Sequence, residues 1–330
     1  MLRYSVAIIF LSFLLACNNA ADKPDVSDIK VAVKLNRFEE SFFAADTNNL
    51  VASIQNLNKQ YPDFYPLFSQ QFIGSDEPNI KAFIYYHQFL YDSLKKKYPD
   101  LNWLKEDLNE AMRYVKHYFP TYKVPNFFTY IGPFNSPGIV ILDNSIGIGL
   151  HQYAGKNFSA YSSPEILEMY PQYISRRFDK EYILPNAIKG VVASIYPDSS
   201  DGRPLIEQMI EKGKEWYLLD KFLPDINDSL ITGFTGDQLK WTTTNEANIW
   251  SQITTTEDIY SVDPEVIQRY IGPAPFTNTM SQEYSPGNLG QWIGWQIVKR
   301  YVEKNPGLSL EKIIKTPAST IYNEAKYKPK

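Results

Sequence analysis

The side chains that most often carry out catalysis are few in this sequence, and their spacing excludes the commonest catalytic sites. The three histidines, His87, His117 and His151, lie at least 30 residues apart along the chain. The zinc-binding motif HExxH, which needs two histidines four residues apart on one helix, is therefore absent. The sequence also contains no GxSxG nucleophile motif, no phosphate-binding P-loop and no GxGxxG dinucleotide motif. We therefore expect neither a bound metal nor a cofactor.

His151 is the one histidine that the sequence places near a strand-to-loop junction. It follows the segment GIGL at residues 147–150. A single histidine without a partner motif is more often a packed structural residue than a catalytic one. We expect the same of His87 and His117, which lie in aromatic-rich helical segments.

Carboxylates and tryptophans in the second half of the chain form a candidate ligand cleft. Glu246 and Trp250 are four residues apart and share one face of a predicted helix, and Glu215 lies on an earlier predicted helix. Trp292 and Trp295 stand close to two glycines, where the missing side chains allow another backbone to approach. Together these residues suggest a cleft with a carboxylate floor and aromatic walls, suited to a peptide or a sugar. The alternative is that the tryptophans belong to the core and the glutamates to the surface or to helix caps.

Composition and charge fit a globular protein of one or two domains. The chain has 330 residues, of which 44% are hydrophobic and 21% charged, so a large core can form and extensive disorder is not expected. The formal net charge is only −4, and no basic stripe occurs along the sequence. Nucleic acid is therefore not an expected partner.

The N-terminus predicts a lipoprotein signal. Arg3 precedes an apolar run of 11 residues, SVAIIFLSFLL, which has the length of a secretory signal and is too short to span a bilayer. The only cysteine, Cys17, follows in the segment LLAC, which resembles the lipobox of bacterial lipoproteins. The resemblance implies that Cys17 becomes the first mature residue and carries lipid. The alternative is an ordinary signal peptide in which the cysteine is incidental.

The chain accordingly divides into a signal peptide at residues 1–16, a tether at residues 17–27 and a single domain at residues 28–330. Asn18 and Asn19 follow the cysteine without the aspartate that marks inner-membrane retention in the best-known sorting rule. No acidic cluster follows Cys17 of the kind that resembles a surface-export signal in Bacteroidota lipoproteins. We therefore expect a cell-envelope protein that is anchored by lipid to the periplasmic face of the outer membrane.

The hydrophobic pattern of the domain predicts an α+β fold that is mostly helical, with a small sheet. Apolar residues return every three or four positions in the helical segments, and short β-rich runs are separated by turn signals. The expected strands are residues 31–35, 126–130, 138–142 and 146–150, and the expected early helices are residues 50–61, 80–98 and 103–118. After residue 164 the pattern is helical again, with boundaries marked by Pro204 and Pro224, a capping box at Thr235 and Gln238, a cap at Ser285-Pro286 and another at Ser309.

Several longer motifs resemble the gliding motility lipoprotein GldB family of Bacteroidota. They run through most of the mature chain: GIGL before YAG at residues 147–155, PQYI at 171–174, YILPNA at 182–187, LIEQMI at 205–210, NEANIW at 245–250, GP at 272–273, SPG at 285–287, WIGWQIV at 292–298 and YKPK at 327–330. His151-Gln152 departs from the family pattern, in which a pair that begins with Asp is expected at this place. The difference weakens any functional role assigned to that loop. The resemblance implies a membrane-anchored lipoprotein of the gliding apparatus, associated with its secretion or envelope-assembly machinery.

A more distant resemblance connects the domain with predicted bacterial zinc peptidases. In that class one helix carries HExxH, and the next begins with a Glu-Gly pair that supplies the third ligand. The corresponding positions here hold Asn186, Lys189 and Gly190 on the first helix, and Lys212 precedes Gly213 on the second. An ammonium group lacks the lone pair that Zn²⁺ requires from imidazole or carboxylate. The resemblance therefore implies a zincin-like scaffold that has lost its metal.

Three hypotheses follow for the function. The first is a non-enzymatic lipoprotein, a pseudoenzyme that works with other gliding or secretion proteins. The second is an active hydrolase of peptides or peptidoglycan with a non-standard site around His151, Glu215 or Glu246, and the third is a glycan-binding lipoprotein that uses exposed tyrosines and tryptophans. The candidate cleft or partner surface comprises His151, Asn186, Lys189, Lys212, Glu215, Glu246, Trp250, Trp292 and Trp295.

Overall fold

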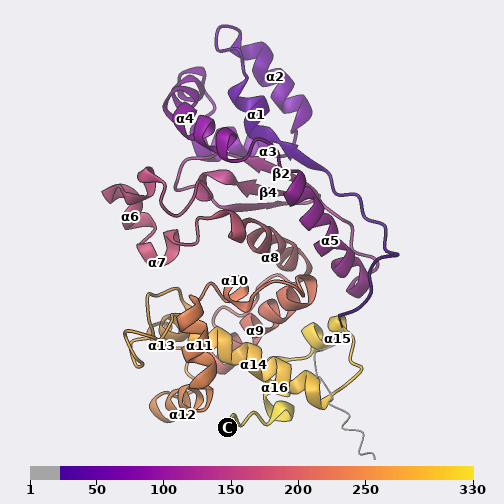
Figure 1. Cartoon of the computed structure of the whole chain (residues 1–330), viewed down its shortest axis with the longest axis vertical. Coiled ribbons are helices and arrows are strands. Elements are labelled where there is room, and N and C mark those ends of the chain that lie inside the picture. The colour runs from indigo at the N-terminus through magenta and orange to yellow at the C-terminus, as the bar shows by residue number, and fades with distance from the viewer. Residues whose placement is uncertain (1–22) are drawn as a thin grey trace, which may run out of the picture.

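A small β-sheet separates two groups of helices (Figure 1). The computed structural model describes residues 23–330. The strands are β1 (Leu35–Arg37), β2 (Asn126–Tyr130), β3 (Ile139–Leu142) and β4 (Ser145–Gly149), in the order β1-β2-β4-β3. β1, β2 and β4 run parallel, whereas β3 is antiparallel to β4 and is joined to it by a tight turn at residues 143–144.

An aromatic core covers one face of the sheet. The covering helices are α1 (Phe38–Phe43), α2 (Leu50–Gln60), α3 (Phe64–Leu67) with its π-helical continuation (Phe68–Ile73), and α4 (Glu77–Lys97). Phe64 packs on Phe128 of β2 at a ring-centroid distance of 4.4 Å and meets Phe38 edge-on at 4.9 Å. At Gly147 of β4, a Cβ atom would come within 2.6 Å of the Phe128 ring. Glycine at this position therefore allows the aromatic ring to lie across the sheet.

Mostly aliphatic side chains fill the other face of the sheet. Phe127 of β2 and Ile146 and Ile148 of β4 belong to the same buried cluster as residues of α5 (Asn102–Tyr118) and α8 (Ile183–Ile195). The buried residues of α5 return every three or four positions. This spacing gives α5 one apolar stripe toward the core and leaves a polar face free on the outside. The short helices α6 (Pro164–Met169) and α7 (Gln172–Ser175) lie to one side, between β4 and α8 in the chain.

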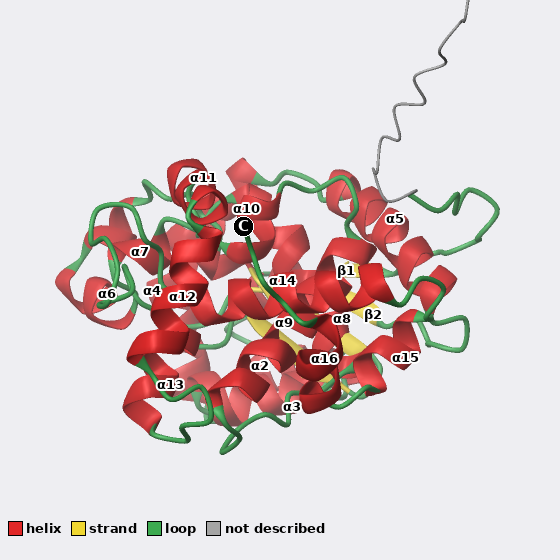
Figure 2. Cartoon of the chain, turned by 90° about the horizontal axis from the view of Figure 1, so that it is seen from below, coloured by secondary structure: helices red, strands yellow, loops and turns green. Residues whose placement is uncertain are grey.

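The second half of the chain adds a helical layer to the same core. Its central pair is α9 (Leu205–Phe222) and α14 (Leu289–Lys304), and Figure 2 shows other helices gathered around them. These are α10 (Asp228–Thr232), α11 (Gly236–Thr244), α12 (Glu246–Thr256), α13 (Pro264–Ile271), α15 (Leu310–Lys315) and α16 (Ala318–Ala325). One continuous hydrophobic cluster runs from the sheet through α8 and α9 to α14. The described chain is therefore one α+β domain.

Two glycines bring the backbones of α9 and α14 into direct contact. A Cβ atom added at Gly294 of α14 would lie 1.6 Å from the carbonyl oxygen of Met209 on α9. A Cβ atom added at Gly213 of α9 would lie 2.2 Å from the carbonyl carbon of Gly294. The sequence analysis predicted such a close approach beside Trp292 and Trp295, and the structure confirms it at Gly294.

The structure confirms the predicted fold class and most of the predicted elements. The three strands after residue 126, the three early helices and the helices that begin near residues 205 and 289 all lie within a few residues of their expected positions. Thr235 and Gln238 form the predicted capping box of α11. Ser309 caps α15 by accepting a hydrogen bond from the Lys312 N–H.

Two local predictions are wrong, and two helical segments were not predicted. The strand expected at residues 31–35 begins only at Leu35, because the Val33 N–H donates to the side chain of Asn109 on α5 at 2.8 Å and does not pair in the sheet. Ser285-Pro286 does not cap α14, whose N-cap is Asn288 in the left-handed conformation, with φ 59°. The Ser285 hydroxyl instead accepts a hydrogen bond from the Thr277 N–H at 3.2 Å. The helical segments at residues 38–43 and 64–73 were not predicted.

The α9–α14 contact gives a direct test of the packing. Gly294→Ala should lower the free energy of unfolding by about 2 kcal/mol, because a methyl group there meets backbone atoms that cannot move away by changing rotamer. Urea denaturation measures the change. Gly236→Ala is the matched control, since a Cβ atom at Gly236 of α11 would meet nothing within 4 Å. Equal stability of the two variants would contradict the close packing of α9 on α14.

Candidate functional site

The helix pair α8 and α9 carries four of the residues that the sequence analysis proposed. Asn186 and Lys189 lie on α8, and Lys212 and Glu215 lie on α9. Lys189, Lys212 and Glu215 line one cavity of about 330 Å³ between the two helices, and Gln291 of α14 also borders it. We call this space the α8–α9 cavity. It is the place where the structure brings candidate residues from two helices together.

Two carboxylates hold Lys212 at the wall of this cavity. The Lys212 ammonium lies 2.9 Å from Glu215 Oε1 and 2.6 Å from Asp198 Oδ2. Burial disfavours the charge of Lys212, but the two carboxylates outweigh this effect and raise its pKa. Burial also raises the pKa of Glu215, against the opposing effect of Lys212. The charges of this group are therefore largely satisfied within the protein.

Lys189 differs from Lys212 because no ion pair or hydrogen bond to its ammonium is found among residues 23–330. Burial lowers the pKa of Lys189 to about 8, Arg177 adds to this shift, and Glu215 opposes it. The Lys189 side chain also lines a second cavity beside β3, together with Asn186, whose amide donates to the Tyr153 hydroxyl at 2.9 Å. Lys189 therefore offers a half-buried positive charge to a ligand that carries a negative group.

The side chains around the α8–α9 cavity are poorly suited to a metal ion. In the part of the chain that the structure describes, no three His, Cys, Asp or Glu side chains are grouped so that they could hold a metal. The two lysines that border the cavity carry ammonium groups, which repel a cation and donate no lone pair. An anionic ligand is favoured over a cation near Lys189.

His151 lies in a separate, buried place at the end of β4. Its Nδ1 accepts a hydrogen bond from the Gly132 N–H at 3.2 Å, so the proton of the neutral ring is on Nε2. Nε2 lies 3.2 Å from Ser136 Oγ, and that hydroxyl donates to the Pro133 carbonyl at 2.7 Å. A protonated Nε2 cannot accept the serine proton, so this serine–histidine pair does not have the arrangement of a nucleophile and its base. The interpretation of His151 as a packed structural residue fits these contacts.

The two late tryptophans belong to the core. Trp292 and Trp295 are both buried, and Trp295 meets Trp216 edge-on at a centroid distance of 6.0 Å. Gly294 beside them admits α9, and Gly290 admits Tyr270 of α13, so these glycines do not open a cleft. None of the tryptophans in the described residues is fully exposed; the large exposed aromatic side chains there are tyrosines and one phenylalanine. The prediction that Trp292 and Trp295 form the walls of a ligand cleft is therefore wrong.

Glu246 and Trp250 share one face of α12, as predicted, but they contact the C-terminus of the chain. Glu246 accepts a hydrogen bond from the Tyr327 hydroxyl at 2.5 Å, and Trp250 packs edge-on against the same tyrosine at 5.5 Å. Neither residue lines the α8–α9 cavity. The structure thus gathers Lys189, Lys212 and Glu215, with Asn186 next to them, and places the other five candidate residues elsewhere.

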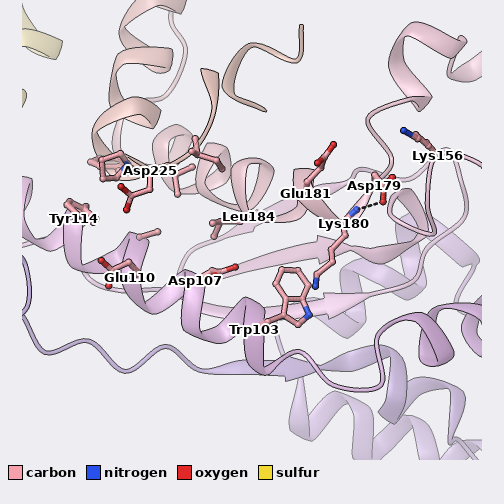
Figure 3. A pocket seen from close by; sticks show the side chains of 15 residues that line it. Trp103, Asp107, Glu110, Tyr114, Lys156, Asp179, Lys180, Glu181, Leu184 and Asp225 are labelled. Carbon is pink, nitrogen blue, oxygen red and sulfur yellow. Dashed lines mark hydrogen bonds between the residues drawn. The ribbon is translucent and has the colours of Figure 1, made fainter. Parts of the chain in front are cut away.

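A cavity more than twice the volume of the α8–α9 cavity was missed by sequence reasoning. It is a groove of about 790 Å³ between α5, the start of α8 and the segment that follows α9, and we call it the α5 groove (Figure 3). Trp103, Asp107, Glu110 and Tyr114 form its α5 wall. Their spacing places them on one helix face, which combines aromatic and acidic residues. This pattern was the one feature of the sequence that could have indicated the groove. The opposite walls, residues 179–184 and 222–226, are distant in sequence and gave no such signal.

Comparison with known proteins identifies the family. Residues 19–329 match the family model described as gliding motility protein GldB. The chain belongs to the GldB family. No curated protein and no solved structure matches the chain. The match confirms the resemblance seen in the sequence, and membership implies a role in gliding motility, in the cell envelope and together with other motility proteins.

The predicted lipid anchor of this GldB-family protein lies outside the described residues. Cys17, the signal peptide at residues 1–16 and the first part of the tether all precede residue 23. Within residues 23–330, no helix combines the length and the apolar character needed to cross a bilayer. Lipidation at Cys17 remains a prediction from the sequence.

The burial of His151 predicts a pH dependence of stability. Burial lowers its pKa from 6.5 to about 4, so the unfolded chain binds the proton more readily than the folded one. Neutral His151 therefore contributes to the free energy of unfolding. This contribution is roughly 3 kcal/mol, is fully present above about pH 6.5 and is lost as the pH falls to about 4. Denaturation at several pH values should show a smaller loss in His151→Gln than in the parent protein, and the remaining loss includes that of His87, whose pKa burial also lowers.

The control is His117→Gln, because His117 is exposed on α5. This variant should keep the pH dependence of the parent between pH 6.5 and pH 4. If His151→Gln and His117→Gln showed the same dependence as the parent, the buried neutral state of His151 would be refuted.

Proposed function

We propose that the protein is a non-enzymatic component of the gliding apparatus, built on a zincin-like scaffold that has lost its metal ligands. The observation that carries the proposal is the pair of lysines beside the α8–α9 cavity. Lys189 on α8 and Lys212 on α9 stand near the positions where the distant resemblance to zinc peptidases expects metal ligands. An ammonium group has no lone pair to give, so both lysines need deprotonation before they could bind Zn²⁺.

The proposal includes a lipid anchor on Cys17 at the periplasmic face of the outer membrane. The lipobox-like segment ends in the only cysteine of the chain, and the residues after it carry no inner-membrane retention signal. A chain of this kind lies on the membrane surface and does not cross it. From this position the domain would contact other gliding, secretion or envelope-assembly proteins.

One observation favours the hydrolase hypothesis as a second candidate. Glu215 has a raised pKa and lies at a cavity next to Lys189, whose pKa is lowered. Perturbed groups that meet in a cavity are typical of catalytic sites, although buried ion pairs perturb pKa values in the same directions. Glu215 is already paired with Lys212 at 2.9 Å, which leaves it less free to act as a general base. We therefore rank binding above catalysis.

Metal content and activity separate these two candidates. The purified full-length protein should contain well below one equivalent of zinc by elemental analysis, because the cavity offers ammonium groups where ligands are needed. Peptide and peptidoglycan substrates should not be cleaved, and any background hydrolysis should be equal in the parent, in Glu215→Gln and in Glu246→Gln, whose site is outside the cavity. One equivalent of zinc that a chelator removes together with a measurable activity would favour the hydrolase.

The anchor is tested by Cys17→Ser. The substitution should abolish labelling by a fatty-acid analogue and move the protein from the membrane fraction to the soluble periplasmic fraction. Gliding of the cells should decrease if the lipid places the domain beside its partners. Retention of unlabelled Cys17→Ser protein in the membrane fraction would show that something other than a lipid holds it.

A further inference from the structure

The α5 groove combines an apolar floor with an acidic rim. Leu184, Phe222 and Leu223 contribute to its apolar lining, together with Ala111 of α5. Five carboxylates and only two lysines line the same groove; the carboxylates are Asp107, Glu110, Asp179, Glu181 and Asp225, and the lysines are Lys156 and Lys180. Figure 3 shows the acidic side chains distributed over both walls. A groove of this composition is complementary to a ligand that has positive charges and some apolar surface.

Two lysines of the chain itself already show how the groove receives an ammonium group. Lys23, in the N-terminal segment, donates to Asp225 and stands over the Tyr114 ring at 5.7 Å. Lys180 extends toward Trp103 and lies over its ring at 4.2 Å (Figure 3). Both contacts place an ammonium group against an aromatic face of α5, which is a favourable cation–π geometry. The groove is therefore built to accept lysine or arginine side chains at its edges.

Carboxylates remain available after these internal contacts are counted. Asp107 and Glu181 are both exposed at the rim, and neither has an ion pair within residues 23–330. Partial desolvation of the Asp107 carboxyl raises its pKa, and the charge of Lys180 opposes this shift. An incoming cation would stabilise the charged form of both carboxylates.

We propose that the α5 groove binds a basic, partly apolar peptide segment of a partner protein in the same membrane. The position of Lys23 supports this choice of partner, in a step that rests on the lipid anchor proposed above. Lys23 follows Cys17 by six positions, a span of roughly 20 Å at most. The end of the groove at Asp225 and Tyr114, which Lys23 contacts, is thus kept close to the bilayer surface, within reach of segments of other envelope proteins.

Binding of a model peptide tests the proposal. The full-length protein in detergent micelles is titrated into a fluorescein-labelled peptide made of lysine and leucine, and fluorescence anisotropy is recorded. We expect saturable binding that weakens with added salt, and no binding of the same peptide with glutamate in place of lysine. Asp107→Lys combined with Glu181→Lys should weaken binding at least about tenfold. Lys23→Ala should strengthen it, because Asp225 and Tyr114 become free.

A matched pair of charge reversals controls for net charge. Glu283→Lys combined with Glu324→Lys changes the net charge equally, at two exposed residues outside the groove. This pair should change binding less than about twofold. Absence of lysine–peptide binding, equal binding of the glutamate peptide, or equal loss in the two reversed pairs would overturn the proposal. Because the assay is done in micelles, its outcome does not depend on lipid at Cys17, so failure of the groove and failure of the anchor remain distinguishable.

Discussion

The arrangement of the whole second half of the molecule depends on the backbone contact between α9 and α14. Gly213 and Gly294 remove the two side chains that would otherwise separate these helices. The contact holds α9 at the centre of the domain, with α8 and α5 on the sheet side and α16 beside α14. The α8–α9 cavity and the α5 groove both border α9 or the segment that follows it. A shift of α9 by the width of one methyl group would therefore change the shape of both.

A buried lysine connects α9 to the end of α15. Lys214 is almost completely buried, and its ammonium lies 3.0 Å from Glu211 Oε1 and 2.8 Å from the carbonyl oxygen of Thr316. It also bonds the Ile314 carbonyl, so it satisfies the last carbonyls of α15 with a positive charge. Desolvation makes such a buried pair costly, and the hydrogen bonds to the two carbonyls offset part of that cost. Consecutive positions of α9 thus have different roles, since Lys212 faces the cavity, Gly213 meets α14 and Lys214 orients α15.

The sequence predicted the fold better than it predicted the site, and the reason is physical. Helix spacing, caps and turn residues are local, so α5, the capping box at Thr235 and the strands β2 to β4 could be recognised from neighbours in the chain. Residues four apart, such as Glu246 and Trp250, can be assigned to one helix face from the sequence. The element that packs on that face cannot be identified in this way. For α12 that element is the C-terminal segment with Tyr327, and for Trp292 it is the core. The α5 groove has walls from three distant segments, and only tertiary packing brings them together.

The α8–α9 cavity and the α5 groove differ in how their charges are balanced. Lys189, Lys212, Asp198 and Glu215 line the α8–α9 cavity, and the contacts of Lys212 with both carboxylates largely satisfy its charges. The α5 groove instead presents five carboxylates against two lysines. An excess of one charge favours a ligand of the opposite charge. The groove is therefore the better suited of the two to bind a partner protein, which fits the role that we propose within the GldB family.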